Sequence, residues 1–336
     1  MDIIRLKSVF KQMIWGGSRM IGEFGYDIPG DDTGECWAVS AHKNGDCEIE
    51  GGEFDGMKLS ELWETRQDVF GNAGQILKDR LRAEGIEADG LPVFPLLTKI
   101  IDARQDLSIQ VHPDDAYAMA HENGSLGKTE CWYVLDAEPG TTIVIGHNAK
   151  TREGLADMIE NGRWGEFIRE IPVHKGDFFQ IYPGTLHAIK GGTMILETQQ
   201  NSDITYRVYD YDRLQNGKPR QLHIRQSIDV ITVPFTGSEA SDKGRPMSAP
   251  EGCGSSCTPL VHCKYYNVRR LDIDGKDSYI QDEPFLICSV IGGEGRITRT
   301  GETDGEVIRK GDHFILPAGF GGFTLEGGMR LICSSI

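Results

Sequence analysis

The sequence predicts a mainly β fold: two antiparallel jelly-roll barrels with a few accessory α-helices. The chain has 42 glycines among its 336 residues, and many glycines and prolines fall in the polar turns between short apolar runs. Several of these runs alternate with the period of a strand, and few segments have the period of a helix. Short strands joined by tight turns are typical of antiparallel barrels and jelly rolls.

The amino-terminal part is expected to combine strands with one or two helices. Residues 3–13 and 35–40 have the pattern of strands. Residues 59–82 carry apolar side chains at helical spacing, with Ser60 and Asn72 as candidate caps. We therefore expect helices set beside strands in this part.

The stretch from residue 94 to residue 122 is predicted to organise the fold. An apolar run at 94–101 precedes a strand at 107–112, and we expect the two to form a hairpin. Gln110 and His112 are two residues apart in that strand, so their side chains point the same way. Pro113-Asp-Asp115 then begins a short helix, because proline fits the first turn and acidic side chains suit the amino end.

Later elements divide the chain into units. Strands are predicted at 131–135, 142–146, 178–182 and 194–198, and helices at 152–159 and 222–231. We expect a metal-binding unit with inserted helices at 1–235, a linker or excursion rich in Gly, Ser and Pro at 236–256, and a second all-strand unit at 257–336.

Charge and composition exclude several partners. The formal charge of −16 repels nucleic acid and anionic membranes, and no apolar stretch approaches the roughly 20 residues of a membrane span. We expect a cytoplasmic protein, a monomer or weak homodimer, that acts on a small molecule. Its eight cysteines are then reduced thiols, and Cys253, Cys257 and Cys263 lack the paired spacing of a zinc ribbon.

Four polar side chains from separate parts of the chain are candidate ligands for one metal ion. Gln110 and His112 share a strand face, Glu130 begins the next apolar run, and His187 follows a Pro-Gly turn. Each alone is more often a hydrogen-bonded strand residue than a ligand. Together they offer two imidazoles, a carboxylate and an amide oxygen, which suit zinc or another first-row divalent ion.

The chain contains an internal duplication, and the candidate ligands occur in only one of the two copies. Lys175-Gly-Asp177 recurs as Lys310-Gly-Asp312, each followed by an apolar strand and a turn with Pro and Gly. In this alignment Phe285 stands where the first copy has Glu130, and residues 320–322, Phe-Gly-Gly, stand in the region of His187. The second copy keeps the turns and lacks these ligands, which favours a functional role for them in the first copy.

The motifs around these residues resemble a known family. The chain resembles the cupin superfamily and, within it, type I mannose-6-phosphate isomerases of the shorter bacterial kind, over most of its length up to about residue 225. The matching motifs are Trp15-Gly-Gly17, Gly34-Glu-Cys-Trp37, Gln110-Val-His-Pro-Asp-Asp115, Gly127-Lys-Thr-Glu-Cys-Trp-Tyr133, Pro183-Gly-Thr-Leu-His-Ala188, Glu197-Thr-Gln-Gln-Asn-Ser-Asp-Ile-Thr-Tyr-Arg207 and Tyr209-Asp-Tyr-Asp-Arg213.

The resemblance implies one Zn²⁺ per chain, held by Gln110, His112, Glu130 and His187, and interconversion of mannose 6-phosphate and fructose 6-phosphate through an enediolate. A divalent ion suits this chemistry because it stabilises the oxyanion and orients two substrate oxygens.

The resemblance also supplies catalytic and substrate-binding candidates. Arg207, Lys128 and Glu197 match catalytic positions, and Arg207, Lys128 and Arg213 match cationic positions suited to a sugar phosphate. A planar guanidinium can make two hydrogen bonds to a phosphate at once. The group that moves the proton stays open between a zinc-bound water, Glu197 and Lys128.

Two other functions are weighed against this one. His112, Glu130 and His187 also form the two-histidine, one-carboxylate set of iron oxygenases, although Gln110 would occupy a position that such enzymes need open. A non-catalytic sugar-sensing module would bind ligand without turnover, and the intact ligand set counts against it.

Overall fold

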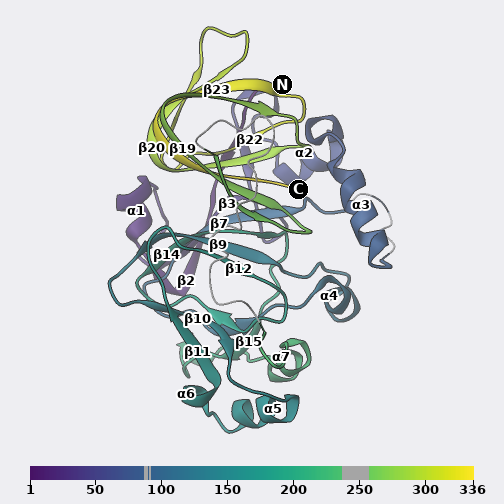
Figure 1. Cartoon of the computed structure of the whole chain (residues 1–336), viewed down its shortest axis with the longest axis vertical. Helices are drawn as coiled ribbons and strands as arrows, with labels where there is room; N and C mark the ends of the chain where they lie inside the picture. The colour runs from purple at the N-terminus through teal and green to yellow at the C-terminus, as the bar shows by residue number, and fades with distance from the viewer. Residues whose placement is uncertain (87–89, 91, 237–256) are drawn as a thin grey trace.

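The structure is a computed structural model that describes residues 1–86, 90, 92–236 and 257–336. It is mainly β, as predicted, with short helices at its periphery (Figure 1). The predicted linker at 236–256 lies, apart from residue 236, outside the described residues, as does Cys253.

Two sheets form the part of the molecule that carries the candidate site. The six-stranded sheet has the order β12 (Phe178–Ile181), β9 (Glu130–Ala137), β14 (Thr193–Gln200), β7 (Leu96–Asp102), β3 (Thr33–Val39), β2 (Val9–Gly17). The five-stranded sheet has the order β11 (Ile168–Pro172), β10 (Thr142–His147), β13 (His187–Ala188), β8 (Ile109–Val111), β15 (Tyr206–Tyr209).

The eight-stranded sheet contains most of the second predicted unit. Its order is β18 (Cys257–His262), β19 (Asn267–Gln281), β23 (Gly321–Ser335), β20 (Leu286–Arg299), β22 (His313–Leu316), β1 (Ile4–Lys7), β6 (Glu48–Glu50), and β21 (Glu306–Arg309) pairs with β20. Two strands from the start of the chain thus complete this sheet. Short ribbons pair β4 (Ala41–His42) with β5 (Gly45–Asp46) and β16 (Leu214–Gln215) with β17 (Lys218–Pro219). No closed barrel is found among the described strands, so the two-barrel description stays a prediction.

Most helices lie where the sequence predicts them. They are α1 (Arg19–Phe24), α2 (Leu59–Thr65), α3 (Ala73–Ala83), α4 (Asp115–His121), α5 (Arg152–Glu160), α6 (Trp164–Phe167) and α7 (Ile224–Val230), with 3₁₀ turns at Gly52–Phe54 and Gln67–Phe70. The segment 59–82 is broken into α2, a 3₁₀ turn and α3. Ser60 is not a cap, because it lies inside α2 and bonds Asp46, while Asn72 occupies the N-cap position of α3 without a side-chain cap bond.

The predicted hairpin between residues 94–101 and 107–112 is wrong. β7 pairs with β3 and β14, whereas β8 pairs with β13 and β15 in the other sheet. The sequence between them therefore crosses from one sheet to the next. An apolar run predicted one strand and alternation the other, but neither pattern contains information on the partners of a strand.

The duplication is visible in strand pairing. The order β12–β9–β14 in the first copy matches β22–β20–β23 in the second. Glu130 lies opposite Ile181, and Leu286 lies opposite Leu316. The residue that corresponds to Glu130 is therefore Leu286, one position beyond the Phe285 of the sequence alignment, and it is equally unable to bind a metal.

One apolar core spans the two predicted units. Phe285 of the second unit packs against Phe70 and Phe94 of the first, with ring centroids 5.9 and 5.3 Å apart. All three side chains are almost fully buried. Burying large aromatic side chains is a main source of folding free energy, so this contact holds the eight-stranded sheet against the first unit. The described helices include none long and apolar enough to cross a membrane.

Candidate metal centre

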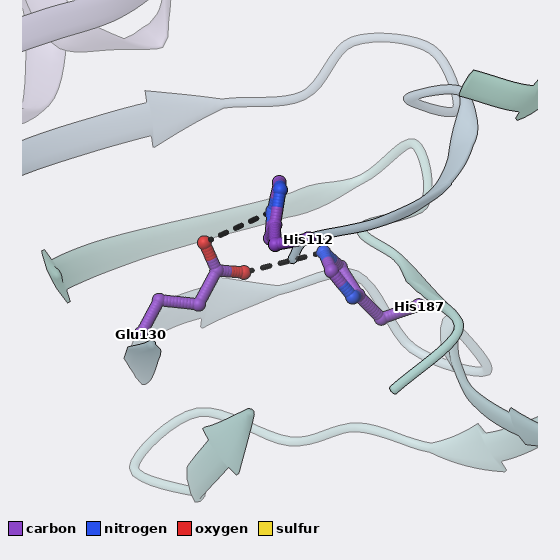
Figure 2. Close-up of side chains that lie close together, drawn as sticks. All are labelled: His112, Glu130 and His187. Carbon is purple, nitrogen blue, oxygen red and sulfur yellow. Dashed lines mark ion pairs between the residues drawn. The ribbon is translucent and has the colours of Figure 1, made fainter. Parts of the chain in front are cut away.

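Three of the four predicted ligands lie close enough together to hold one metal ion. Glu130 lies between two histidines, with its Oε2 3.4 Å from His112 Nε2 and its Oε1 3.3 Å from His187 Nε2 (Figure 2). One candidate ligand atom from each residue lies within 4.8 Å of the others, and all three residues are buried. Two nitrogens and a carboxylate facing a common point are the ligand pattern of a first-row divalent ion.

Strand pairing brings these residues together. His187 of β13 lies opposite Gln110 of β8, and Arg207 of β15 lies opposite Gln110 on its other side. His112 follows directly after β8, and Glu130 is the first residue of β9 in the six-stranded sheet. The site therefore lies where the two sheets face each other, and its residues converge although they are far apart in sequence.

Each histidine is held by its other ring nitrogen. His112 Nδ1 lies 2.7 Å from the carbonyl of Ile204, and His187 Nδ1 lies 2.8 Å from that of Thr185. A carbonyl only accepts hydrogen bonds, so both Nδ1 atoms carry the proton and both Nε2 lone pairs face Glu130. This is the arrangement by which proteins orient a metal-binding imidazole.

Burial keeps these imidazoles neutral. Burial, followed by the positive charge of Lys128, lowers the pKa of His112 to about 3, and burial also lowers the pKa of His187. For Glu130, burial acts in the opposite direction, but Lys128 and then His112 hold its pKa well below the usual value. Neutral imidazoles beside an ionised carboxylate are the protonation states that bind metal.

Gln110 also reaches the site. Its Nε2 lies 3.4 Å from His187 Nε2. The oxygen and nitrogen of an amide exchange places by rotation about one bond, so this side chain can present an oxygen to the same point. Gln110 thus adjoins the cluster, and its role as a ligand stays a prediction.

Lys128 and Glu197 adjoin the candidate ligands. Lys128 Nζ lies 2.6 Å from Glu130 Oε2 and 3.6 Å from Glu197 Oε1. Trp132 Nε1 donates to Glu130 Oε1 and Glu197 Oε2, at 3.1 Å in each case. Burial, and then the charge of Glu130, raises the pKa of Glu197 to about 7. Burial acts to lower the pKa of Lys128, but Glu130 and Glu197 outweigh it and raise that pKa.

Two charged residues that the sequence analysis missed extend this network. Lys99 Nζ lies 3.9 Å from Glu197 Oε1 and 3.6 Å from Glu35 Oε2. Acidic and basic side chains therefore alternate along one series of contacts: Glu35, Lys99, Glu197, Lys128 and Glu130. The signal in the sequence was a lysine within the apolar run 94–101, because a lysine is almost never fully buried unless it is paired.

The two predicted arginines differ in their surroundings. The Nε of Arg207 is buried and has no hydrogen-bond partner among the residues that the structure describes. Its Nη1 lies 3.4 Å from the carbonyl of Gln221. Burial lowers its pKa, and the charge of Arg220 adds to the effect. Arg213 instead bonds Asp210, which Arg220 also bonds. The charge of Arg213 is thus already partly neutralised, and its role stays a prediction.

A cavity of about 550 Å³ lies beside the site. Its lining includes Ile204, whose carbonyl holds His112, together with Asp203 and Asn44. A cavity of this size is within the usual range for sites that bind small molecules. The cavity adjoins the residue that holds His112 Nδ1, and none of the four candidate ligands lines it.

Comparisons with known proteins agree with this site. Residues 3–138 match the family described as phosphomannose isomerase type I, catalytic domain, and residues 256–336 match that described as mannose-6-phosphate isomerase, cupin domain. The mannose-6-phosphate isomerase ManA of Bacillus subtilis is 47% identical over 98% of both chains, and the mannose-6-phosphate isomerase of Streptococcus mutans is 45% identical over 98% of this chain and 96% of that one.

Solved structures give the same result. The crystal structure of the mannose 6-phosphate isomerase from Bacillus subtilis has a TM-score of 0.88, with 43% identity and full coverage of both chains. A putative mannosephosphate isomerase from Archaeoglobus fulgidus has a TM-score of 0.71 at 18% identity, which supports the fold alone. Since relatives well above 40% identity extend over nearly the whole chain, it belongs to the type I mannose-6-phosphate isomerase family.

Proposed function

We propose that this protein is a metal-dependent isomerase that interconverts mannose 6-phosphate and fructose 6-phosphate. The observation that carries the proposal is the convergence of His112, Glu130 and His187, with both Nε2 atoms facing one carboxylate. Full-length relatives named as mannose-6-phosphate isomerases support the substrate and the reaction.

The residues present fit a zinc ion. His112, His187 and Glu130 supply two nitrogens and an oxygen, and Gln110 is placed to supply an amide oxygen. Such a ligand set suits Zn²⁺, which accepts nitrogen and oxygen ligands and leaves a position for water or substrate. A bound divalent ion supplies Lewis-acid chemistry, because it polarises the sugar carbonyl and offsets negative charge next to it.

Arg207 is the candidate for holding the substrate. Its guanidinium is partly buried, and its Nε has no partner within the described part of the chain. A buried donor that lacks a partner is costly. A phosphate or hydroxyl oxygen of the substrate can accept from that donor. Arg207 lies on the strand beside Gln110, so a sugar phosphate bound there adjoins the metal ligands. Arg213 can contribute only by sharing or exchanging its contact with Asp210.

Glu197 is the side chain best suited to accept the substrate proton. Reaction requires removal of a proton from the carbon beside the carbonyl and its return to the neighbouring carbon. A base works best when its pKa is close to the operating pH, and the pKa of Glu197 is about 7. Lys128 is cationic and contacts Glu197, so it can stabilise this carboxylate and negative charge on the substrate oxygens.

A coupled assay for fructose 6-phosphate tests the proposal. We expect turnover of mannose 6-phosphate to disappear after chelation and to return with Zn²⁺. Recovery with Mn²⁺, Co²⁺ and Fe²⁺ should be measured alongside, because the ligand set alone does not select zinc. Full turnover by protein shown by elemental analysis to be free of metal would refute the metal-dependent reaction.

We also propose that the first copy of the repeat forms a cupin-type unit within residues 1–235 and that residues 257–336 form a second one without metal ligands. The matched strand orders of the two copies support this. A monomer or weak homodimer in the cytoplasm stays a prediction, and light scattering on the purified protein would test its first part.

A further inference from the structure

The backbone amides of residues 127–129 each donate a hydrogen bond. Lys128 N donates to the carbonyl of Pro113 at 3.0 Å, and Thr129 exchanges hydrogen bonds with Gln200. One of these bonds joins Thr129 N to Gln200 Oε1 at 2.8 Å, and the other joins Gln200 N to the Thr129 carbonyl at 3.0 Å. The position of Lys128 therefore depends on what holds Gln200 and its neighbours.

A single carboxylate connects these contacts. Asp115 Oδ1 accepts from Gly127 N at 2.7 Å and from Gln200 Nε2 at 3.0 Å. Gly127 precedes Lys128 in the chain, and Gln200 exchanges hydrogen bonds with Thr129. Asp115 is only 2% exposed, and a buried carboxylate is retained only when donors satisfy it.

The second unit completes this arrangement. Tyr265, in the turn between β18 and β19, lines one small cavity together with Asp115 and Gln200. Burial raises the pKa of the Tyr265 hydroxyl, and the charge of Asp115 raises it further. Arg80 of α3 in turn donates to the carbonyl of Tyr265 at 3.3 Å. Residues of both units thus meet at Asp115.

Close packing leaves little freedom for the segment. A Cβ on Gly127 would lie 2.4 Å from the carbonyl carbon of Asp114 and 2.5 Å from Asp115 N. Backbone atoms at such distances cannot give way cheaply, so only glycine allows this approach. Asp115 and Gly127 are therefore in contact through both backbone packing and a hydrogen bond.

We propose that Asp115 is a positioning residue for the isomerase reaction: it fixes Lys128 against Glu130 and Glu197 through Gly127 and Gln200, and Tyr265 couples it to the second unit. The expected effect of Asp115 on turnover rests on the proposed function. The expected effect of Asp115 on the backbone of residues 127–129 does not.

Amide hydrogen exchange tests the backbone effect without any turnover. In Asp115→Ala, we expect the amides of Gly127 and Thr129 to exchange at least about 10-fold faster than in the parent protein, because their acceptors are lost or released. Asp114→Ala is the matched control. Asp114 accepts from Tyr117 N at the start of α4, so its loss should affect α4 and leave residues 127–129 unchanged. Unchanged exchange at Gly127 in Asp115→Ala would overturn the inference.

Steady-state kinetics test the effect on the reaction. We expect Asp115→Ala to lower kcat by about 10- to 100-fold, as a small displacement of a catalytic group does, with KM and zinc content close to the parent values. Asp115→Asn should restore most of kcat, because its amide oxygen can still accept from Gly127 and Gln200. Loss of zinc in Asp115→Ala would show instead that Asp115 supports the metal ligands.

A double variant identifies the residue through which Asp115 acts. In a Lys128→Met background, adding Asp115→Ala should lower kcat by less than about twofold, because the group being positioned is already absent. Fully additive losses would overturn the assignment to Lys128. Full activity of Lys128→Met together with faster exchange at Gly127 would refute the role of Lys128 in the proposed function and leave the structural role of Asp115 standing.

Tyr265→Phe provides a milder variant in case Asp115→Ala does not fold. It removes one hydroxyl and keeps the ring that Arg80 packs against at 5.7 Å. We expect faster exchange at Gly127 and a kcat lowered by about two- to fivefold, because the hydroxyl that adjoins Asp115 is lost. Parent-like values for both would remove the second unit from the proposal.

Discussion

Replacement of Lys99 by methionine tests whether Glu197 is the base. Lys99 is 3% exposed, and its Nζ lies 3.9 Å from Glu197 Oε1. Its charge favours the ionised form of Glu197, whose pKa burial and Glu130 raise to about 7. Removal of that charge must raise the pKa further. The base would then be protonated, and so inactive, up to a higher pH.

The size of the effect follows from the distance. Two unit charges 3.9 Å apart interact by about 4 kcal/mol at an effective dielectric constant of about 20, which corresponds to about three pH units. Water that enters the space left by the ammonium will reduce this. We therefore expect the acid limb of kcat against pH to move upward by about one pH unit or more, so that kcat falls by about tenfold at any pH below both limbs.

The assay compares two zinc-loaded proteins over pH 5.5–9.5. A divalent ion near Glu197 lowers its pKa in both proteins, so the difference between their acid limbs isolates the charge of Lys99. Lys11→Met is the matched control, because Lys11 also lies over the ring of Trp37 but donates to the carbonyl of Asn44. Superimposable acid limbs for Lys99→Met and the parent would refute Glu197 as the base.

Three further predictions concern the metal, the substrate and stability. In His187→Ala, zinc measured after dialysis should fall by at least about 100-fold, with turnover nearly lost; retention of both would remove His187 from the site. Arg207→Ala should lose turnover and keep its zinc, and a large loss of zinc would contradict its assignment to substrate. Burial lowers the pKa of His313 from 6.5 to about 4. Between pH 6.5 and pH 4, therefore, the unfolded chain binds a proton at this residue and the folded chain does not. The free energy of unfolding should decrease by up to about 3 kcal/mol as the pH is lowered through this range. His313→Phe should flatten that fall in urea unfolding at pH 7 and 5, and an equal fall in both proteins would contradict this.

The local structure could be predicted because it depends on short-range patterns. The helix predicted at 152–159 is confirmed as α5, where Thr151 accepts from Gly154 N at the N-cap. Of the strand predicted at 107–112, β8 covers only Ile109–Val111. Gln110 contacts His187 and His112 contacts Glu130, so both side chains reach the same cluster. Periodicity determines which way neighbouring side chains point, and this was enough to select candidate ligands.

Long-range features could not be predicted in the same way. Residues 94–101 and 107–112 were expected to pair because they are neighbours in the chain, whereas β7 and β8 belong to different sheets. Lys99 was overlooked because its partners Glu35 and Glu197 are distant in sequence. Arg213 was assigned to substrate from its motif, and its contact with Asp210, which Arg220 shares, depends on how a later loop folds.

The second copy of the repeat contributes to the site without carrying a ligand. Tyr266, from the same turn as Tyr265, places its hydroxyl 3.0 Å from the amide nitrogen of Gln180 in β12. In β12, Gln180 pairs with Cys131, directly after Glu130 in β9. The turn of the second unit therefore supports the strand that carries the carboxylate as well as the helix that carries Asp115. One contact ends on β12, which pairs with the strand of Glu130, and the other ends on α4, which carries Asp115. Loss of ligands from the second copy therefore does not make it dispensable, and changes in this turn should reach the site through β12 and α4.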